Sequence, residues 1–337
     1  MALEIQEGVD LTPLNTFGVP AKARALVIVH SVEEALVLAE KHKEWGPYFF
    51  LGGGSNILFT RDVEETLVKV EIPGREVVDD GPDGTYVEAG AGEEWHPFVA
   101  WTLSKGFPGL ENLALIPGTV GGAPVQNIGA YGLELKDRFH SVEVLDVKEG
   151  TLKRLFSPDL RFGYRHSLFK EEGAKHLLIL RVGVFLPKPW VPVLEYPDLR
   201  KALASTDDPT AEDIFSAVMA IRRHKLPDPA ATGNAGSFFK NPVVDEAVYQ
   251  DLLKEHPGLP GYAAGEGKVK LSAAWIIDRL GWKGKTLGRA GVAPTHALVL
   301  VNVGGATGQE ILELALRIRE DVERAFGIRL EFEPTIY

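Results

Sequence analysis

The chain has 337 residues, a mass of 36.8 kDa and a formal net charge of −11, and 45% of its residues are hydrophobic. This length and composition suffice for two or three domains with apolar cores. Basic residues are fewer than acidic ones, 36 against 47, and they are scattered, so the electrostatic footprint of a nucleic-acid-binding protein is missing. The absence of cysteine excludes disulfides, thiolate zinc sites, iron–sulfur clusters and a cysteinyl link to a cofactor, so redox chemistry would need a bound cofactor.

The sequence also carries no sign of export or membrane insertion. Its first residues lack a basic start followed by an apolar stretch, and it contains no run of eighteen apolar residues. We therefore expect a cytoplasmic protein that binds neither membranes nor nucleic acid.

Taken in chain order, the predicted elements of the first half mix strands and helices. The β-rich segment 25–30 leads into Ser31, whose sequence SVEE predicts a capping box opening an amphipathic helix that runs to about Glu44. The sequence PYFFLGGGSNILF predicts a strand, a glycine turn and a second strand. Further strands are predicted at 66–72, 85–90, 142–147 and 177–186, and a helix at 95–105.

The second half begins with a Pro-rich segment, 187–209, that has little periodicity and predicts an excursion or a connection between domains. Helices are predicted near 210–224, 272–280 and 308–326, with a strand at 296–303, and Gly327 suits the position just past the last helix. Because strands do not alternate regularly with helices, an α+β fold is favoured over a doubly wound parallel sheet.

Two glycine-rich segments are the main functional signals. GGGSN at 52–56 offers bare backbone amides to a phosphate, although glycine serves a tight hairpin turn equally well, and neither the Walker motif nor GxGxxG is present. The longer segment IPGTVGGAPVQNIGAYG, 116–132, removes side chains from a connected path that would fit against a flat group. The alternative for this segment is a buried crossover packed on neighbouring backbone. Together the two segments could hold the two ends of one long ligand, with a pyrophosphate on the first and a planar ring on the second.

Six motifs, in order along the chain, resemble the UDP-N-acetylenolpyruvoylglucosamine reductase (MurB) family. They are NTFG (15–18), LGGGSNIL (51–58), PGLENLALIPGTVGGAPVQNIGAYG (108–132), RFGYRHSLFK (161–170), KLPDP (225–229) and GNAGSFFKNPVV (233–244). The resemblance extends from Asn15 to about Glu333, nearly the whole chain. VLEYPDL at 193–199 is similar to the subgroup that carries an extra tyrosine loop over the substrate.

The resemblance implies an α+β fold with a vanillyl-alcohol-oxidase-like (PCMH-type), two-part FAD-binding region and a C-terminal α+β substrate-binding domain. The implied FAD-binding subdomains are 1–72 and 73–225, the second including the tyrosine loop 187–209. The UDP-sugar-binding domain would be 226–322, and 323–337 would be a tail returning to the active site.

The implied activity is that of a UDP-N-acetylmuramate dehydrogenase of peptidoglycan synthesis, a process of cell-wall biogenesis. In this family NADPH reduces non-covalent FAD, and hydride then passes from flavin N5 to the enolpyruvyl β-carbon of UDP-N-acetylglucosamine enolpyruvate. The resemblance also assigns ligand contacts. Those to FAD are Gly52, Gly53, Gly54, Ser55, Asn56, Gly118, Gly122, Ile128 and Arg222. Those to the UDP-sugar substrate are Tyr131, Tyr196, Lys225 and Asn241.

Three more residues are implied for catalysis. Hydride addition leaves negative charge that spreads into the substrate carboxylate, so the site must stabilise an enolate and deliver one proton. Arg165 corresponds to the arginine beside that carboxylate, and Ser237 to the proton donor, for which position matters more than acidity. Glu333 aligns with the second glutamate of the family ending LEPEV, here LEFEP, and Glu331 remains a competitor. Taken singly, these residues would be an ordinary surface arginine, a turn serine and solvated strand-end charges.

The nine histidines form no HExxH or comparable array, so we expect no metal site, and we expect a monomer. Two other functions stay open on sequence. A sugar or alcohol oxidase of the same flavin fold would lack the set Arg165, Ser237 and Lys225. A nucleotide-sugar-binding protein or transferase would grip phosphates with both glycine segments and bind no flavin.

Overall fold

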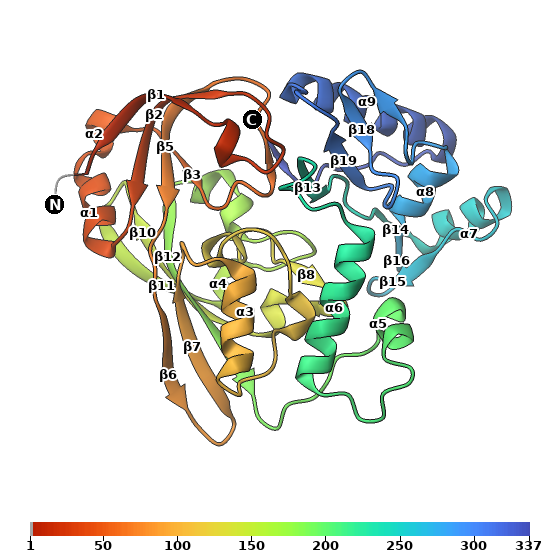
Figure 1. The fold of residues 1–337 in the computed structure, drawn as a ribbon, viewed down its shortest axis with the longest axis horizontal. Helices are drawn as coiled ribbons and strands as arrows, with labels where there is room; N and C mark the ends of the chain where they lie inside the picture. Colours follow the sequence, from red (N-terminus) through yellow and green to blue (C-terminus); the bar gives the residue numbers. More distant parts are fainter. Residues whose placement is uncertain (1–2) are drawn as a thin grey trace. The chain divides into compact units, whose positions relative to one another are not determined.

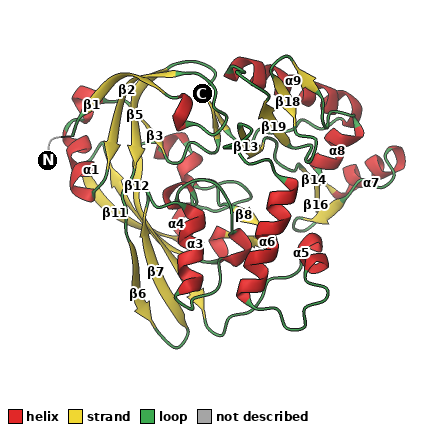
Figure 2. Ribbon diagram, viewed as in Figure 1, coloured by secondary structure: helices red, strands yellow, loops and turns green. Residues whose placement is uncertain are grey.

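The computed structural model describes residues 3–337, and its backbone contacts divide the chain into two compact units (Figures 1 and 2). Unit 1 comprises the chain up to Val9, Ala23–Gly54 and Val63–Arg222. Unit 2 comprises Asp10–Lys22, Ser55–Asp62 and Arg223–Tyr337. Each unit is therefore assembled from three separate stretches of sequence.

The first sheet of unit 1 has the strand order β1-β2-β5-β3. Its strands are β1 (Ile5–Asp10), β2 (Lys22–Val29), β3 (Tyr48–Leu51) and β5 (Val63–Val70). The pairs β2–β5 and β3–β5 are parallel, and α1 (Val32–Glu40) and α2 (His42–Trp45) connect β2 to β3. The predicted cap on this connection is half confirmed: the Ser31 hydroxyl accepts from the Glu34 amide at 3.1 Å, but the Glu34 carboxylate accepts from the amide of His30, at 2.7 Å.

The second sheet of unit 1 is antiparallel, with the order β11-β10-β12-β7-β6. Its strands are β6 (Arg75–Asp80), β7 (Gly84–Gly90), β10 (Phe139–Asp146), β11 (Thr151–Phe156) and β12 (Leu177–Pro187). One apolar core joins both sheets to helix α3 (Trp95–Ser104), and it includes Val27, Val68, Val87, Val182 and Phe98. Burial of this shared core is the main force holding unit 1 together.

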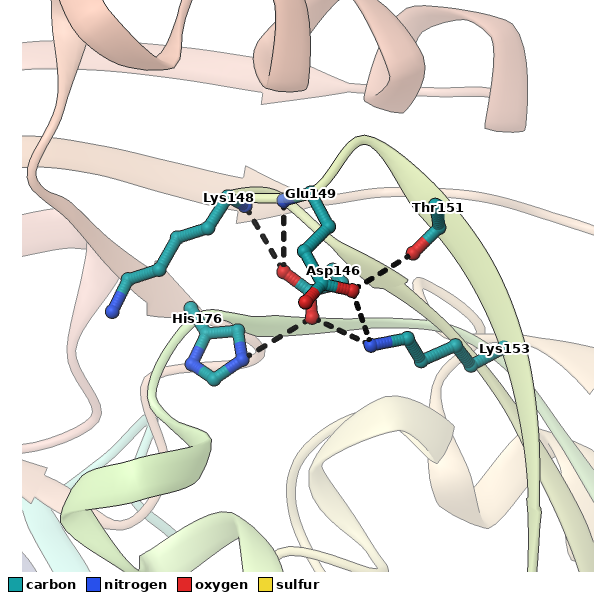
Figure 3. Close-up of polar contacts among 6 residues, drawn as sticks. All are labelled: Asp146, Lys148, Glu149, Thr151, Lys153 and His176. Atoms are coloured by element: carbon teal, nitrogen blue, oxygen red, sulfur yellow. Dashed lines mark hydrogen bonds and ion pairs between the residues drawn. The ribbon is translucent and has the colours of Figure 1, made fainter.

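The turn after β10 is built around a buried carboxylate (Figure 3). Asp146 is 2% exposed, accepts from the Lys148 and Glu149 amides at 3.1 Å each, and pairs with Lys153 at 2.8 Å and with His176 at 3.3 Å. Burial by itself would raise the pKa of Asp146, but the hydrogen bonds from Lys153 and the Glu149 amide outweigh it, so the pKa is lowered.

Unit 2 contains a sheet of order β13-β19-β18-β17 and a smaller one of order β14-β16-β15. The strands of the first are β13 (Asn234–Ser237), β17 (Thr286–Leu287), β18 (Ala290–Val292) and β19 (Val299–Asn302). Those of the second are β14 (Val243–Asp245), β15 (Gly261–Ala263) and β16 (Lys268–Leu271). The helices are α7 (Glu246–Glu255), α8 (Ala273–Arg279) and α9 (Gly308–Phe326). A short tail strand, β20 (Thr335–Ile336), pairs in parallel with β4 (Ile57–Leu58).

Several remaining elements are short. They are α4 (Ser157–Leu160), α5 (Pro197–Ala202), β8 (Gly129–Ala130) and β9 (Leu133–Glu134). The longer helix α6 (Ala211–Lys225) confirms the prediction at 210–224, and Gly327 ends α9 with a φ of 65° as predicted. The strands flanking GGGSN are also confirmed, but the hairpin alternative is wrong because β3 pairs with β5 while β4 pairs with β20. Among the described residues, no helix has the length and apolar character needed to cross a membrane.

Candidate flavin and substrate site

The two glycine segments predicted separately from the sequence lie against each other in unit 1. A Cβ built on Gly53 would lie 2.9 Å from the Cα of Gly118, and one built on Gly52 would lie 2.7 Å from Oγ1 of Thr119. Real side chains do not approach other atoms so closely, so the two backbones touch only because these residues are glycines.

Backbone hydrogen bonds fix the second segment to the turn that follows β7. The amides of Val120 and Gly121 donate to Glu93 at 2.8 Å and to Ala91 at 2.9 Å, and the Trp95 amide donates to the Gly118 carbonyl at 3.0 Å. A Cβ on Gly121 would lie 2.6 Å from that of Ala91. The segment is thus held on one side by the β7–α3 connection.

Backbone strain is concentrated in and around this segment. Leu115, Asn127 and Tyr131 have φ values of 58°, 46° and 49°, and Arg165, which contacts the segment, has a φ of 53°. Residues with side chains pay about 1–2 kcal/mol in this left-handed region, so the surroundings must hold them there. For Asn127 they do: its amide donates to Glu134 and to the Gly163 carbonyl at 3.1 Å each, and its oxygen accepts from the Lys136 amide at 2.9 Å.

Two arginines hold carbonyls of the same stretch. Arg165 lies in a tight turn closed by hydrogen bonds between Gly163 and His166, and its Nη2 donates to the Gly129 carbonyl at 2.9 Å. Nε of Arg222 donates to the Leu115 carbonyl at 3.2 Å. Burial, with a smaller contribution from the charge of Arg165, lowers the pKa of Arg222. Two cations this close to each other suit an anionic ligand.

Tyr131 and Tyr196 meet edge to face, with ring centroids 5.1 Å apart. Burial raises the pKa of Tyr131 to about 12, so its hydroxyl stays neutral at physiological pH. Tyr196 precedes helix α5 within the segment 187–209, which the sequence predicts to be an excursion or a connection. The structure places this segment within unit 1.

In unit 2, Ser237 ends strand β13 opposite Val299 of β19. The pairing is irregular before it, where Gly236 has a φ of 69° and its amide donates to Oδ1 of Asn234 at 2.9 Å. The C-terminal tail runs beside the next residues, since the Glu333 amide donates to the Phe238 carbonyl at 2.9 Å. Ser237 and Glu333 therefore lie on neighbouring segments.

The two tail glutamates have different surroundings. The Glu331 side chain is 75% exposed and pairs with Lys240 at 2.9 Å. Glu333 is partly buried, and its carbonyl accepts from the Asn56 side chain at 3.4 Å. The Thr335 amide also donates to the Asn56 carbonyl at 3.0 Å. The backbone of Glu333 is thus tied both to the Ser237 segment and to the end of the GGGSN loop.

In unit 2, Lys225 lies near two residues that the sequence does not single out, Lys283 and His296. Burial, followed by the charges of Lys225 and Lys283, lowers the pKa of His296. Nδ1 of His296 accepts from the Leu298 amide at 3.2 Å, which fixes the ring. Neither Lys283 nor His296 stands in a motif, so only their position in the fold reveals them.

Asn241 has a structural contact as well as its predicted one. Its side-chain oxygen accepts from the Ala273 amide at 3.0 Å, in the first turn of α8.

The predicted residues are divided between the units. Unit 1 contains Gly52, Gly53, Gly54, Gly118, Gly122, Ile128, Tyr131, Arg165, Tyr196 and Arg222. Unit 2 contains Ser55, Asn56, Lys225, Ser237, Asn241 and Glu333. Within unit 1 the structure brings together the glycines and the two arginines, and within unit 2 it brings together Ser237, Glu333 and Asn56. Among residues 3–337, no cluster of three or more His, Asp or Glu could hold a metal ion.

Comparison with known proteins identifies the class. Residues 23–155 match a family described as an FAD binding domain, and residues 228–337 match the C-terminal domain of UDP-N-acetylenolpyruvoylglucosamine reductase. An FAD-binding region joined to the C-terminal domain of a reductase defines a flavin-dependent oxidoreductase.

The full-length relatives make the identification specific. The UDP-N-acetylenolpyruvoylglucosamine reductase of Pseudomonas aeruginosa is 51% identical, covering 100% of both chains, and that of Azoarcus sp. is 51% identical over 98% of this chain and 97% of the relative. The chain belongs to the UDP-N-acetylenolpyruvoylglucosamine reductase (MurB) family. The crystal structure of MurB from Thermus caldophilus matches 100% of this chain and 99% of its own, with a TM-score of 0.67 and 26% identity.

These findings confirm the resemblance seen in the sequence and the α+β fold with a vanillyl-alcohol-oxidase-like FAD-binding region. They also confirm non-covalent FAD as the cofactor and NADPH as the hydride donor. The oxidase and the flavin-free transferase are thereby set aside.

The residues present fit this cofactor. Gly52 and Gly53 expose bare backbone and pack against the second glycine segment with no room for a side chain, and Gly54 has a φ of 61°. Between the two glycine segments lies the hydroxyl oxygen of Thr119, which is buried and has no hydrogen-bond partner among residues 3–337. It would lie 3.6 Å from a Cβ on Gly122. Bare backbone with an unsatisfied polar atom suits a ligand that is itself polar and needs close approach.

Proposed function

We propose a division of roles in which unit 1 holds FAD and the substrate carboxylate, while unit 2 holds the nucleotide and supplies the proton. As a member of its family, the chain is an NADPH-dependent flavoenzyme of peptidoglycan precursor synthesis. It reduces UDP-N-acetylglucosamine enolpyruvate to UDP-N-acetylmuramate.

Bound FAD would supply the redox chemistry, the relay of hydride from NADPH to the enolpyruvyl β-carbon. In our proposal the glycines at 52–54 and 118–122, with Ser55, Asn56 and Ile128, hold this cofactor mainly through backbone groups, as the contact of Gly53 with Gly118 suggests. Arg222 adds a fixed positive charge beside the same segment.

Arg165 is proposed to stabilise the enolate that hydride addition produces. Its guanidinium is held in place by the Gly129 carbonyl at 2.9 Å, and it remains charged at any physiological pH. A positioned cation of this kind stabilises the transition state because it needs no reorientation as charge develops on the substrate carboxylate.

Ser237 is proposed to donate the proton to the α-carbon, with Glu333 beside it. The observation that carries this assignment is the hydrogen bond from the Glu333 amide to the Phe238 carbonyl, which pairs the tail with the serine's own segment. Glu331 is bound to the same segment farther from Ser237, since its carbonyl accepts from the Lys240 amide at 2.9 Å, and its side chain is exposed and paired with Lys240. A serine is a weak acid, so its role depends on being held at the reacting carbon.

The nucleotide part of the substrate is proposed to bind unit 2 through the positive charges of Lys225 and Lys283, with the neutral imidazole of His296 near them. Asn241 is proposed as a further contact in unit 2, and Tyr131 and Tyr196 of unit 1 are proposed as contacts to the same substrate. The proposed domains, in chain order, are two FAD-binding subdomains, 1–72 and 73–225, and a UDP-sugar-binding domain, 226–322. The last segment, 323–337, is the proposed catalytic tail. We also propose a cytoplasmic location, because the charged nucleotides that the enzyme uses are made inside the cell. We propose that the protein is a monomer, and a mass of 36.8 kDa by light scattering would support this.

The test separates the two half-reactions. Ser237→Ala should leave flavin reduction by NADPH intact but slow reoxidation by the enolpyruvyl substrate by about 10²–10⁴-fold, the range for loss of a positioned acid. Ser237→Cys, which keeps an ionisable proton, should restore part of the rate. Equal slowing of both half-reactions would mean that Ser237 only shapes the site.

A further inference from the structure

Two buried polar residues of unit 1, Glu111 and Asn112, take no part in the contacts proposed so far. They are 2% and 0% exposed, in the short 3₁₀ turn Glu111–Leu113. The hydrogen bonds that these buried side chains make show which segments they hold in place.

Both residues bind the tyrosine loop, 187–209. The Glu111 carboxylate accepts from the indole nitrogen of Trp190 at 2.7 Å and from the Gly109 amide at 2.6 Å. The Asn112 amide donates to the Val193 carbonyl at 2.9 Å and to the Tyr131 carbonyl at 2.8 Å. One amide group thus ties the loop to the end of the long glycine segment.

Apolar packing also holds the tyrosine loop at this point. Residues 189–195 have no regular structure. Val193 packs against the main core of unit 1, whereas Trp190 and Leu194 pack on a small separate apolar cluster. That cluster is centred on Ala114, Leu199, Ile214 and Val218. Gly132 also lies close to the loop, since a Cβ built on it would lie 3.1 Å from Cγ1 of Val193.

The consequence concerns the two tyrosines. Asn112 holds the backbone of Tyr131 in its left-handed conformation, and the same amide group holds Val193, three residues before Tyr196. We call Glu111 and Asn112, with their hydrogen bonds to the loop and to Tyr131, the clamp. The edge-to-face contact between the two tyrosines therefore depends on the clamp.

We propose that Glu111 and Asn112 are positioning residues that fix the tyrosine loop beside Tyr131 and so set the affinity for the UDP-sugar substrate. The inference rests on the proposed function, in which Tyr131 and Tyr196 contact that substrate. A loop held in its binding conformation does not have to be ordered when the ligand arrives. Loss of the clamp therefore raises the apparent Kd by the reciprocal of the fraction of molecules in which the loop stays in place. The hydrogen bonds of the clamp do not involve Arg165 or Ser237. Loss of the clamp should therefore leave the rate of the chemical step unchanged.

The experiment uses FAD-loaded, NADPH-reduced enzyme mixed anaerobically with UDP-N-acetylglucosamine enolpyruvate over a range of concentrations. Trp190→Phe removes only the indole N–H and keeps a ring in the apolar cluster, while Glu111→Gln keeps the shape but turns one acceptor into a donor. Each should raise the apparent Kd of the reoxidation step about 10-fold or more, from loss of a hydrogen bond to a charged group, with the limiting rate within about twofold of wild type. Trp101→Phe, an indole in helix α3 outside the loop, should change neither quantity.

Tyr196→Phe separates the failure of this inference from that of the proposed function. If Tyr196→Phe weakens substrate binding and the two clamp variants do not, the clamp has no positioning role while the proposed function stands. If neither Tyr196→Phe nor the clamp variants change the apparent Kd for the substrate, the proposed contact of Tyr196 with the substrate is wrong, and the inference about the clamp is wrong as well. A fall in the limiting rate at unchanged Kd, or a lower Tm as the sole effect, would also overturn the clamp.

Discussion

The contact between the two glycine segments can be tested by adding one methyl group. In Gly53→Ala the new Cβ would lie 2.9 Å from the Cα of Gly118 and 3.4 Å from its carbonyl carbon. Both are backbone atoms, which cannot rotate away, so one segment must move. Forcing an extra methyl into a packed site costs about 1–3 kcal/mol, which corresponds to about 5- to 150-fold in an equilibrium constant.

Gly122→Ala provides the matched control, because its Cβ would meet only Oγ1 of Thr119, at an ordinary 3.6 Å. We expect Gly53→Ala to lower the unfolding free energy of the FAD-free protein by about 1–3 kcal/mol and Gly122→Ala to change it by less than about 0.5 kcal/mol. Both should weaken FAD binding, since both glycines are proposed to face the cofactor.

Urea unfolding of the FAD-free proteins and titration of FAD fluorescence measure the two quantities separately. If Gly53→Ala unfolded like the wild type and bound FAD equally well, the two segments would not be in contact, and the reasoning about their close packing would be refuted.

Three other predictions concern the acid–base groups and the arginine. Glu333→Ala should slow flavin reoxidation by the substrate by about 10²-fold while flavin reduction by NADPH is retained, and Glu331→Ala should leave both rates near those of the wild type. If stopped-flow traces showed slow reoxidation in Glu331→Ala and not in Glu333→Ala, the assignment would move to Glu331. Arg165→Lys keeps the charge but loses the planar fork, so reoxidation should slow by about 10-fold or more, and an unchanged rate would contradict its role. Because the pKa of Asp146 is lowered in the folded state, its contribution to stability is complete above the ordinary aspartate pKa of about 3.9 and is lost as pH falls through the folded-state value. Unfolding free energies of wild type and Asp146→Asn should therefore converge below about pH 4, and a pH-independent difference would contradict the ion-paired carboxylate.

Local signals made much of the fold predictable. Helix α9 carries a complete capping box between Thr307 and Glu310 and ends at Gly327, so its bounds follow from neighbouring residues alone. Strands β6 and β11 were missed because they form the two edges of their sheet and most of their side chains are exposed, which leaves no strong apolar alternation to detect.

The site was predictable in its parts but not in its assembly. Glycines at 52–54 and 118–122 indicated close approach to something, and the structure shows that part of what they approach is each other. A single sequence holds no information on such a long-range pairing. For the same reason Lys283 and His296 were missed, since only the fold brings them near Lys225.

Anaerobic mixing of the NADPH-reduced, FAD-loaded protein with UDP-N-acetylglucosamine enolpyruvate tests the central claim most directly. We predict that the absorbance of oxidised flavin returns in full and that UDP-N-acetylmuramate forms in equal amount. A protein that stays bleached while the substrate is recovered unchanged would contradict the reaction assigned to this chain.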